Sequence, residues 1–375
     1  MSDNFCSAPF RGFYQGLDGK ISVCCQAPVL IDNNNYEEAV HDPLIVKLRQ
    51  DFLNNKIPEE CKMCTPRVRT ETTEMCSSDN VEYTLDSHEP VFLDLLWSNK
   101  CNFACMGCSP RISSSMLKYK SAVDILDPLN DEGANYSWNS KEEQQNRIDY
   151  ILKNIKTIKT IHLNGGEPLM QEGFYDLLEQ LIKLKATHIG IWSHTNGSIL
   201  TYKGKDIVNL LKSFDKCKIV MSHDGIGEQG EYVRYGLNQD VWLKNYNRFL
   251  ESEIPTDVQV CYNIFNCLEL EEMADWYEKN LKVRPSLSLW NWPPAYSAKY
   301  IRKIPKLYDE AMYILKTHGK RFRKYRYVLD FMEEPIKDED IEEMHWRFSD
   351  SITKFDQLRN TDFLSTFPKL KDLYF

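Results

Sequence analysis

Three cysteines within eight residues constrain this chain more than any other feature. Cys101, Cys105 and Cys108 are spaced C-x3-C-x2-C and follow the apolar run 91–97, which is typical of a buried strand. Three thiolates on one tight loop can bind three irons of a cubane iron–sulfur cluster and leave a fourth iron without a protein ligand. Zinc sites usually take thiolates as C-x2-C pairs from two separate loops. The spacing therefore indicates a cluster with an open coordination position, which favours chemistry over electron storage.

A second motif, Gly165-Gly166-Glu167-Pro168, follows a second apolar run at 159–164. Together with the three cysteines it resembles the radical S-adenosylmethionine (SAM) family, in which a GGEP motif ends the second strand. That family often has an aromatic residue just before the third cysteine, whereas this chain has Gly107 there. The resemblance implies a [4Fe–4S] cluster on Cys101, Cys105 and Cys108. It also implies reductive cleavage of SAM to a 5′-deoxyadenosyl radical, which makes these three residues both metal-binding and catalytic.

The same resemblance implies further SAM-binding residues. Gly165 and Gly166 let the backbone approach a ligand closely, and Glu167 offers a carboxylate to the ammonium group of SAM. A plain turn before a helix that begins with Glu-Pro would explain the motif equally well when it is taken alone. The remaining predicted SAM-binding residues are polar side chains at or after later strand ends, and each could instead form a turn; they are Asn196, Ser222, Asp224, Arg234 and Asn263.

From residue 90 the chain alternates strand-like and helical patterns, which predicts a parallel sheet. The expected strands lie near 91–97, 159–164, 187–193, 217–222, 257–264 and 285–290. The helices between them fall near 112–122, 141–156, 172–185, 203–214, 239–252 and 268–281. This pattern resembles the partial (β/α)6 TIM-like barrel of radical SAM enzymes, so we expect an α/β fold with the barrel at residues 89–295. Residues 296–375 contain no cysteine and show helical patterns near 305–318 and 338–358. We expect them to form a helical C-terminal extension packed on the barrel.

Residues 1–88 form a cysteine-rich N-terminal module. Asp18-Gly19 lies between two strand-like runs and predicts a hairpin turn that brings Cys6 close to Cys24 and Cys25. Asp42 followed by Pro43 predicts the start of a helix.

The C-x2-C pair Cys61 and Cys64 completes a four-thiolate site with Cys6 and Cys24. The spacing alone fits zinc or a second iron–sulfur cluster. The module resembles the twitch/SPASM modules of radical SAM enzymes, here placed before the barrel. That resemblance implies an auxiliary [4Fe–4S] cluster on these four residues, with Cys25 and Cys76 as the other candidate ligands.

Charge and hydropathy exclude several classes of partner. The net charge of −9 opposes general binding to nucleic-acid backbones, and no apolar stretch approaches the ~20 residues of a membrane span. The first residues carry no secretory signal pattern, so we expect a cytoplasmic protein. In a reducing cytosol, 12 cysteines indicate metal ligation or catalysis, not disulfides.

The resemblance implies a radical SAM enzyme of an oxidoreductase or a peptide- or metabolite-modifying type. Its radical would abstract a hydrogen atom from a peptide side chain or a small biosynthetic intermediate. A reducing partner such as flavodoxin or ferredoxin would supply electrons. Two alternatives remain open. One is a radical SAM enzyme that modifies RNA, and the other is a non-catalytic iron–sulfur electron-transfer or metal-binding protein.

Overall fold

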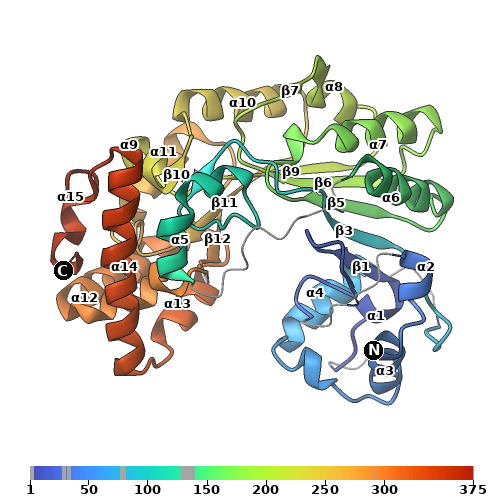
Figure 1. Cartoon of the computed structure of the whole chain (residues 1–375), viewed down its shortest axis with the longest axis horizontal. Helices are drawn as coiled ribbons and strands as arrows, with labels where there is room; N and C mark the ends of the chain where they lie inside the picture. The colour runs from blue at the N-terminus through green and yellow to red at the C-terminus, as the bar shows by residue number, and fades with distance from the viewer. Residues whose placement is uncertain are drawn as a thin grey trace. The chain divides into compact units, whose positions relative to one another are not determined.

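The structure is a computed structural model that describes residues 4–27, 31, 35–76, 82–127, 140–290 and 292–374. Internal contacts divide the chain into two units. Unit 1 comprises Met1–Asn99, Ala134–Ser193 and Thr201–Lys218; unit 2 comprises Lys100–Gly133, His194–Leu200 and Ile219–Phe375. The strands β6 (Gly190–Thr195) and β9 (Cys217–Ser222) begin in unit 1 and end in unit 2. Figure 1 labels the elements of both units.

Unit 1 is built on a mainly parallel sheet with the strand order β9-β6-β5-β3-β1-β2. Strands β3 (Phe92–Leu96), β5 (Thr160–Asn164) and β6 pair in parallel, as the crossover lengths predict. The N-terminal hairpin joins the same sheet, because β1 (Gly12–Gln15) pairs in parallel with β3 and antiparallel with β2 (Ile21–Ser22). The predicted Asp18-Gly19 turn connects β1 to β2, and Gly19 has the positive φ of 76° that suits glycine.

The two faces of the unit 1 sheet differ in character. One face is fully buried and apolar, with Leu93, Leu95, Ile161, Leu163 and Ile191 all 0% exposed. Helices α6 (Lys141–Lys153) and α7 (Glu172–Lys183) run alongside the strands (Figure 1). Both reach Trp97, which continues the apolar face: the Arg147 guanidinium of α6 lies 4.8 Å from its ring, and Gly173 of α7 also lies against it. The opposite face carries Asp94, His162 and Asn164.

The N-terminal cysteines sit on short helices around their own apolar cluster. Asp42 caps α3 (Pro43–Leu53) through the N–H of Leu44, as predicted. The cluster includes Phe10, Leu48 and Phe52, together with Phe92 from β3. The other elements of unit 1 are α1 (Ala8–Arg11), α2 (Tyr36–Ala39), η1 (Glu59–Cys61), α4 (Pro66–Cys76), η4 (Pro168–Met170), β7 (Thr201–Tyr202), β8 (Lys205–Asp206) and α8 (Ile207–Leu211).

Unit 2 holds the parallel strands in the order β9-β11-β12, with β11 at Thr256–Tyr262 and β12 at Ser286–Leu289. A short antiparallel pair joins β4 (Ala104–Cys105) to β10 (Arg234–Tyr235). The helices among these strands are η2 (Ser114–Tyr119), α5 (Lys120–Leu126), α9 (Gly227–Val233), α10 (Gln239–Glu251) and α11 (Leu270–Asn280). Each of the six predicted strand runs therefore contains a strand, and the α/β expectation is confirmed.

The predicted C-terminal helices are also present within unit 2. Helix α12 (Pro305–His318) and helix α14 (Asp338–Arg359) match the expected ranges, and α14 packs beside α5 (Figure 1). The remaining elements are η5 (Pro294–Tyr296), η6 (Ala298–Lys303), η7 (Gly319–Arg321), α13 (Tyr325–Glu333), α15 (Phe363–Thr366) and η8 (Pro368–Leu373). Across the described ranges, we find no helix with the length and hydropathy needed to cross a bilayer.

Removing the buried Leu163 side chain tests the apolar face of the sheet. Leu163 is 0% exposed, so Leu163→Ala should lower the free energy of unfolding by about 2–5 kcal/mol, measured by urea denaturation of the full chain. Leu184 is 50% exposed, so the control Leu184→Ala should stay within about 0.5 kcal/mol of the unsubstituted protein. Equal losses in the two variants would contradict this description of the core.

Candidate functional site: a three-cysteine loop in unit 2

The loop that carries the three cysteines, residues 101–108, is fixed by backbone pairing. Cys105 lies in β4 opposite Arg234 in β10, and the N–H of Met106 donates to the carbonyl of Val233 at 2.8 Å. Serine hydroxyls bind the start of the loop, since Ser113 Oγ donates to the Phe103 carbonyl at 2.6 Å and Ser115 Oγ to the Cys101 carbonyl at 2.8 Å. The short spacing of the cysteines thus becomes one ordered turn.

A buried ion pair lies directly beside this loop. Arg234 Nη2 is 2.7 Å from Asp224 Oδ2, and the two side chains are 12% and 2% exposed. The other terminal nitrogen of Arg234 lies 3.9 Å from Cys105 Sγ, while Asp224 Oδ1 accepts the N–H of Cys261 at 2.7 Å. Asp224 and Arg234 were both predicted as SAM-binding residues. The structure brings them together and places the guanidinium against a cysteine sulfur.

Hydrogen-bond donors point at the cysteine sulfurs. The N–H of Phe103 lies 3.4 Å from Cys101 Sγ, and Asn196 Nδ2 lies 3.9 Å from the same atom. The hydrogen bond from Cys108, followed by the Arg234 charge, lowers the pKa of Cys105 despite its burial. These features favour the thiolate form of Cys105, whereas the hydrogen bond to Cys105, followed by burial, raises the pKa of Cys108 well above its usual value. Hydrogen bonds and positive charge near the sulfurs stabilise thiolate ligands, so the three residues fit a cluster.

Arg359, at the end of α14, is hydrogen-bonded to the cysteine loop. The sequence motifs did not predict this contact. Arg359 Nη2 donates to the Ala104 carbonyl at 2.6 Å, and its Nη1 lies 3.0 Å from Met106 Sδ. The guanidinium also lies over the rings of Tyr119, Tyr235 and Phe355 at 4.3–4.7 Å. Cation–π contacts of this kind stabilise a charge that is only 6% exposed. No local pattern near residue 359 indicates this role, because its partners lie far away in the sequence.

Gly107, the departure from the usual aromatic residue, has a direct structural reason. A Cβ at this position would lie 2.1 Å from Cζ2 of Trp290, whose ring occupies the space. Trp290 itself is 6% exposed and follows β12. A distant tryptophan therefore fills the place beside the third cysteine, and only glycine leaves room for it.

The GGEP motif lies in unit 1. Gly165 has φ of 139°, and a Cβ there would lie 2.5 Å from the Ser98 carbonyl, which also accepts the N–H of Gly166 at 2.7 Å. Glu167 is fully buried, and its Oε1 accepts the N–H of Leu169 at 3.0 Å, so it caps η4. The motif therefore forms the close backbone turn that was expected, and Glu167 has at least a capping role.

The other predicted SAM-binding residues occupy turns of unit 2. Asn196 donates to Asn102 Oδ1 at 2.9 Å as well as pointing at Cys101. Asn263 is fully buried; its Oδ1 accepts the N–H of Phe265 at 2.9 Å and its Nδ2 donates to the Cys261 carbonyl at 2.8 Å. The Ser222 carbonyl accepts the indole N–H of Trp242 at 3.1 Å. Asn196 thus lies at the cysteine loop, whereas the Asn263 amide bonds within its own turn.

The four cysteines predicted for the N-terminal module line one pocket of unit 1. Cys6, Cys24, Cys61 and Cys64 share this pocket with Arg69, which donates to the Cys64 carbonyl. Burial raises the pKa of Cys6 to about 11 and that of Cys61 to about 12. Metal loading would therefore release protons from these thiols. The other two candidates differ: Cys76 is buried at the end of α4, and Cys25 is exposed. In the parts of the chain that the structure describes, no group of three or more His, Cys, Asp or Glu side chains converges on a single-ion position.

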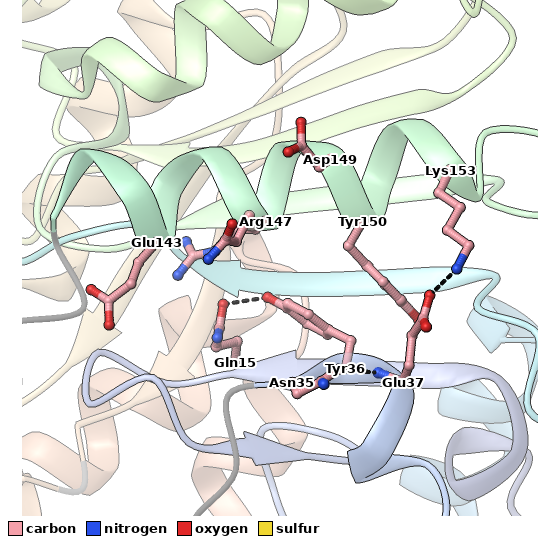
Figure 2. Close-up of a pocket in the computed structure, with 10 residues that line it drawn as sticks. Gln15, Asn35, Tyr36, Glu37, Glu143, Arg147, Asp149, Tyr150 and Lys153 are labelled. Carbon is pink, nitrogen blue, oxygen red and sulfur yellow. Dashed lines mark hydrogen bonds and ion pairs between the residues drawn. The ribbon is translucent and has the colours of Figure 1, made fainter.

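A separate polar pocket of unit 1 lies between α6, α2 and β1 (Figure 2). Tyr36 donates to Gln15, Lys153 pairs with Glu37, and the rings of Tyr36 and Tyr150 stack at 4.4 Å. Its lining includes none of the residues predicted from the motifs. These contacts join the N-terminal module to helix α6.

Comparison with known proteins gives a family for the segment that carries these motifs. The family model of the Radical SAM superfamily matches residues 95–277. The matched segment is just under half of the chain and is similar to radical SAM domains. It spans the cysteine loop, the GGEP turn and the Arg234–Asp224 pair of the preceding paragraphs. No curated protein matches the chain.

Solved structures that resemble this segment and its surroundings are distant. Native anSMEcpe with bound AdoMet and Kp18Cys peptide is 15% identical with a TM-score of 0.42, over 62% of this chain and 62% of the other. Streptococcus suis SuiB bound to precursor peptide SuiA is 14% identical with a TM-score of 0.40, over 77% of this chain and 65% of the other. In both cases the chain spans less than two thirds of the length of the solved protein.

Adding a side chain at Gly107 should disturb the cysteine loop through Trp290. Gly107→Ala pushes against the indole ring, and overpacking of this kind costs about 1–3 kcal/mol. We expect a lower melting temperature and less iron bound after anaerobic reconstitution. Trp290→Ala removes the obstacle, so the double variant should lose less stability than the sum of the two single variants. Additive losses would show that the two residues are not in contact.

His223 should make the fold sensitive to acid. Complete burial lowers the pKa of its imidazole from 6.5 to about 3, and Nδ1 bonds to the hydroxyl of Tyr277 at 2.9 Å. Between these two values the unfolded chain binds a proton that the folded chain does not. Stability from this residue is therefore complete above pH 6.5 and falls as the pH drops toward 3.

Urea unfolding on both sides of pH 6.5 measures this contribution. His223→Gln keeps a polar group for Tyr277 but does not titrate, so this variant should lose less stability on acidification than the unsubstituted protein. Identical pH dependence in both proteins would contradict the burial of a neutral imidazole.

Proposed function

We propose that the chain is a radical SAM enzyme whose cluster is bound by Cys101, Cys105 and Cys108. The observation that carries the proposal is the set of donors around one ordered three-cysteine turn inside the segment that is similar to radical SAM domains: Phe103 N–H and Asn196 toward Cys101, and Arg234 toward Cys105. A cluster bound there would offer its open iron to the amino and carboxylate groups of SAM and supply the electron that cleaves it.

The protein side chains have distinct parts in this proposal. Arg234 and Asn196 stabilise the negative charge on the sulfurs, and Asp224 keeps the Arg234 guanidinium oriented. Gly165 and Gly166 keep the backbone close and free of side chains where the amino-acid part of SAM is proposed to bind. The remaining proposed SAM-binding residues are Glu167, Ser222 and Asn263. The substrate would be a peptide side chain or a small biosynthetic intermediate that loses a hydrogen atom.

The N-terminal module would hold an auxiliary [4Fe–4S] cluster on Cys6, Cys24, Cys61 and Cys64. Support comes from the shared pocket and from Arg69 beside it, which provides a positive charge to offset four thiolates. We propose that residues 1–88, 89–295 and 296–375 act respectively as the auxiliary module, the partial barrel and the packed helical extension. Flavodoxin or ferredoxin is the proposed kind of electron donor.

Counting iron tests both cluster assignments. The full chain, purified without oxygen and reconstituted, should bind roughly eight irons, and Cys101→Ala/Cys105→Ala/Cys108→Ala should retain about four. The unsubstituted protein with dithionite and SAM should release 5′-deoxyadenosine, and the triple variant should release none. About four irons falling to none would remove the auxiliary cluster from the proposal. Stoichiometric zinc without iron, or no 5′-deoxyadenosine, would refute the proposed enzyme.

A further inference from the structure

One face of the unit 1 sheet carries a row of aromatic and ionisable side chains. Tyr14, Asp94, His162 and Trp192 are register partners on β1, β3, β5 and β6, so they stand side by side across four parallel strands. We call these four residues the polar row. Strands buried on both faces of a parallel sheet normally read as continuous apolar runs. Here the row puts an aspartate, a histidine and two aromatic side chains on the face opposite α6 and α7, where Phe92 and Trp192 also pack against the apolar cluster of the N-terminal module. The carboxylate and the imidazole of the row need polar or charged partners, which the apolar cluster does not provide.

The centre of the polar row is a buried carboxylate. Asp94 is nine-tenths buried, and its Oδ1 accepts Asn164 Nδ2 at 2.8 Å and lies 3.2 Å from His162 Nδ1. Across the described residues, His162 is its one ion-pair partner, and no lysine or arginine reaches it. Burial, followed by the charge of Asp94, raises the pKa of Cys25, so this neighbour of Asp94 stays a neutral thiol and offers no positive charge. A buried carboxylate in such surroundings is stabilised by a positive charge.

Aromatic rings flank this carboxylate. The rings of His162 and Trp192 meet edge to face at 6.4 Å, and Phe92 lies 6.3 Å from Trp192. Trp192 and His162 are only partly buried, so they offer surface to a ligand. A carboxylate beside aromatic rings is the combination that binds ammonium and guanidinium groups, through charge-assisted hydrogen bonds and cation–π contact.

We propose that the polar row binds a cationic group of the substrate, an ammonium or a guanidinium, with Asp94 as the charge partner and Trp192 as the aromatic wall. This proposal rests on the proposed function, because the polar row is a substrate site only if the chain is a radical SAM enzyme. Because Cys24 and Cys25 border Asp94, the bound group would lie next to the N-terminal cysteine module. The pocket of Figure 2 is not this site: Gln15 follows Tyr14 along β1 and its side chain points to the opposite face.

Three small probes test the assignment: N-acetyl-lysine methylamide, N-acetyl-arginine methylamide and the neutral N-acetyl-norleucine methylamide. Binding to the anaerobically reconstituted full chain is measured by titration calorimetry. A charge-assisted hydrogen bond to a buried carboxylate should make a cationic probe bind about tenfold or more tightly than the norleucine probe. Asp94→Asn keeps the shape of the side chain and an acceptor oxygen for Asn164 but removes the charge, so it should abolish that preference. Trp192→Leu should reduce it.

Asp149→Asn is the matched control, because it removes one carboxylate from α6, which contributes no residue to the polar row. It should keep the cation preference. Iron content and melting temperature identify any variant that fails to fold, and the Trp192→Leu result then carries the test. No cation preference in the unsubstituted protein, or an unchanged preference in Asp94→Asn, would overturn the assignment. Release of 5′-deoxyadenosine is scored separately, so the proposed function can stand if the polar row fails.

Discussion

The buried ion pair between Arg234 and Asp224 is the constraint on which the cysteine loop depends. Two charges this deeply buried are tolerated only when each is satisfied by the other and by further hydrogen bonds. Here the carboxylate also accepts a backbone N–H from β11, and the guanidinium reaches Cys105. Arg234 lies in β10 and Asp224 is hydrogen-bonded to β11, so the two charges are held from separate strands. Cys105 Sγ therefore lies beside a positive charge, which stabilises the thiolate form of a ligand.

Each of the two groups of cysteines has an arginine beside it, but the arginines come from different places in the sequence. In unit 2, Arg234 and Arg359 come from β10 and α14 and approach the loop from different parts of the sequence. In unit 1, Arg69 follows Cys64 on the next helix and returns to its carbonyl. An arginine suits both places because the guanidinium has several N–H donors. It can contact a sulfur or a carbonyl oxygen while it also pairs with a carboxylate or stacks on an aromatic ring. Arg69 is only five residues from Cys64, so a sequence reader can see that the two are close. Arg234 and Arg359 are more than 100 residues from the cysteine loop, so the sequence does not reveal their contacts.

This contrast explains how much of the structure the sequence could predict. The Asp18-Gly19 turn, the Asp42 cap and the six strands follow from signals a few residues long, and all are present. Gly107 was recognised as a departure, but its cause, Trp290, lies on another element and leaves no local trace. The polar row was readable in principle. Thr160-Ile161-His162-Leu163-Asn164 alternates polar and apolar residues, which a strand covered on both faces would not do. The strand register is needed to show that Asp94 and His162 are neighbours, and the sequence alone does not give that register.

The position of Arg359 in the sequence has a consequence for the order in which the cysteine loop can fold. Arg359 donates to the Ala104 carbonyl but lies 255 residues after Ala104 in the sequence. During synthesis the three thiols leave the ribosome long before the side chain that supports them exists. The hydrogen bond from Arg359 to the Ala104 carbonyl can therefore form only after α14 has been made. A nascent chain that stops short of α14 would lack this support for the cysteine loop.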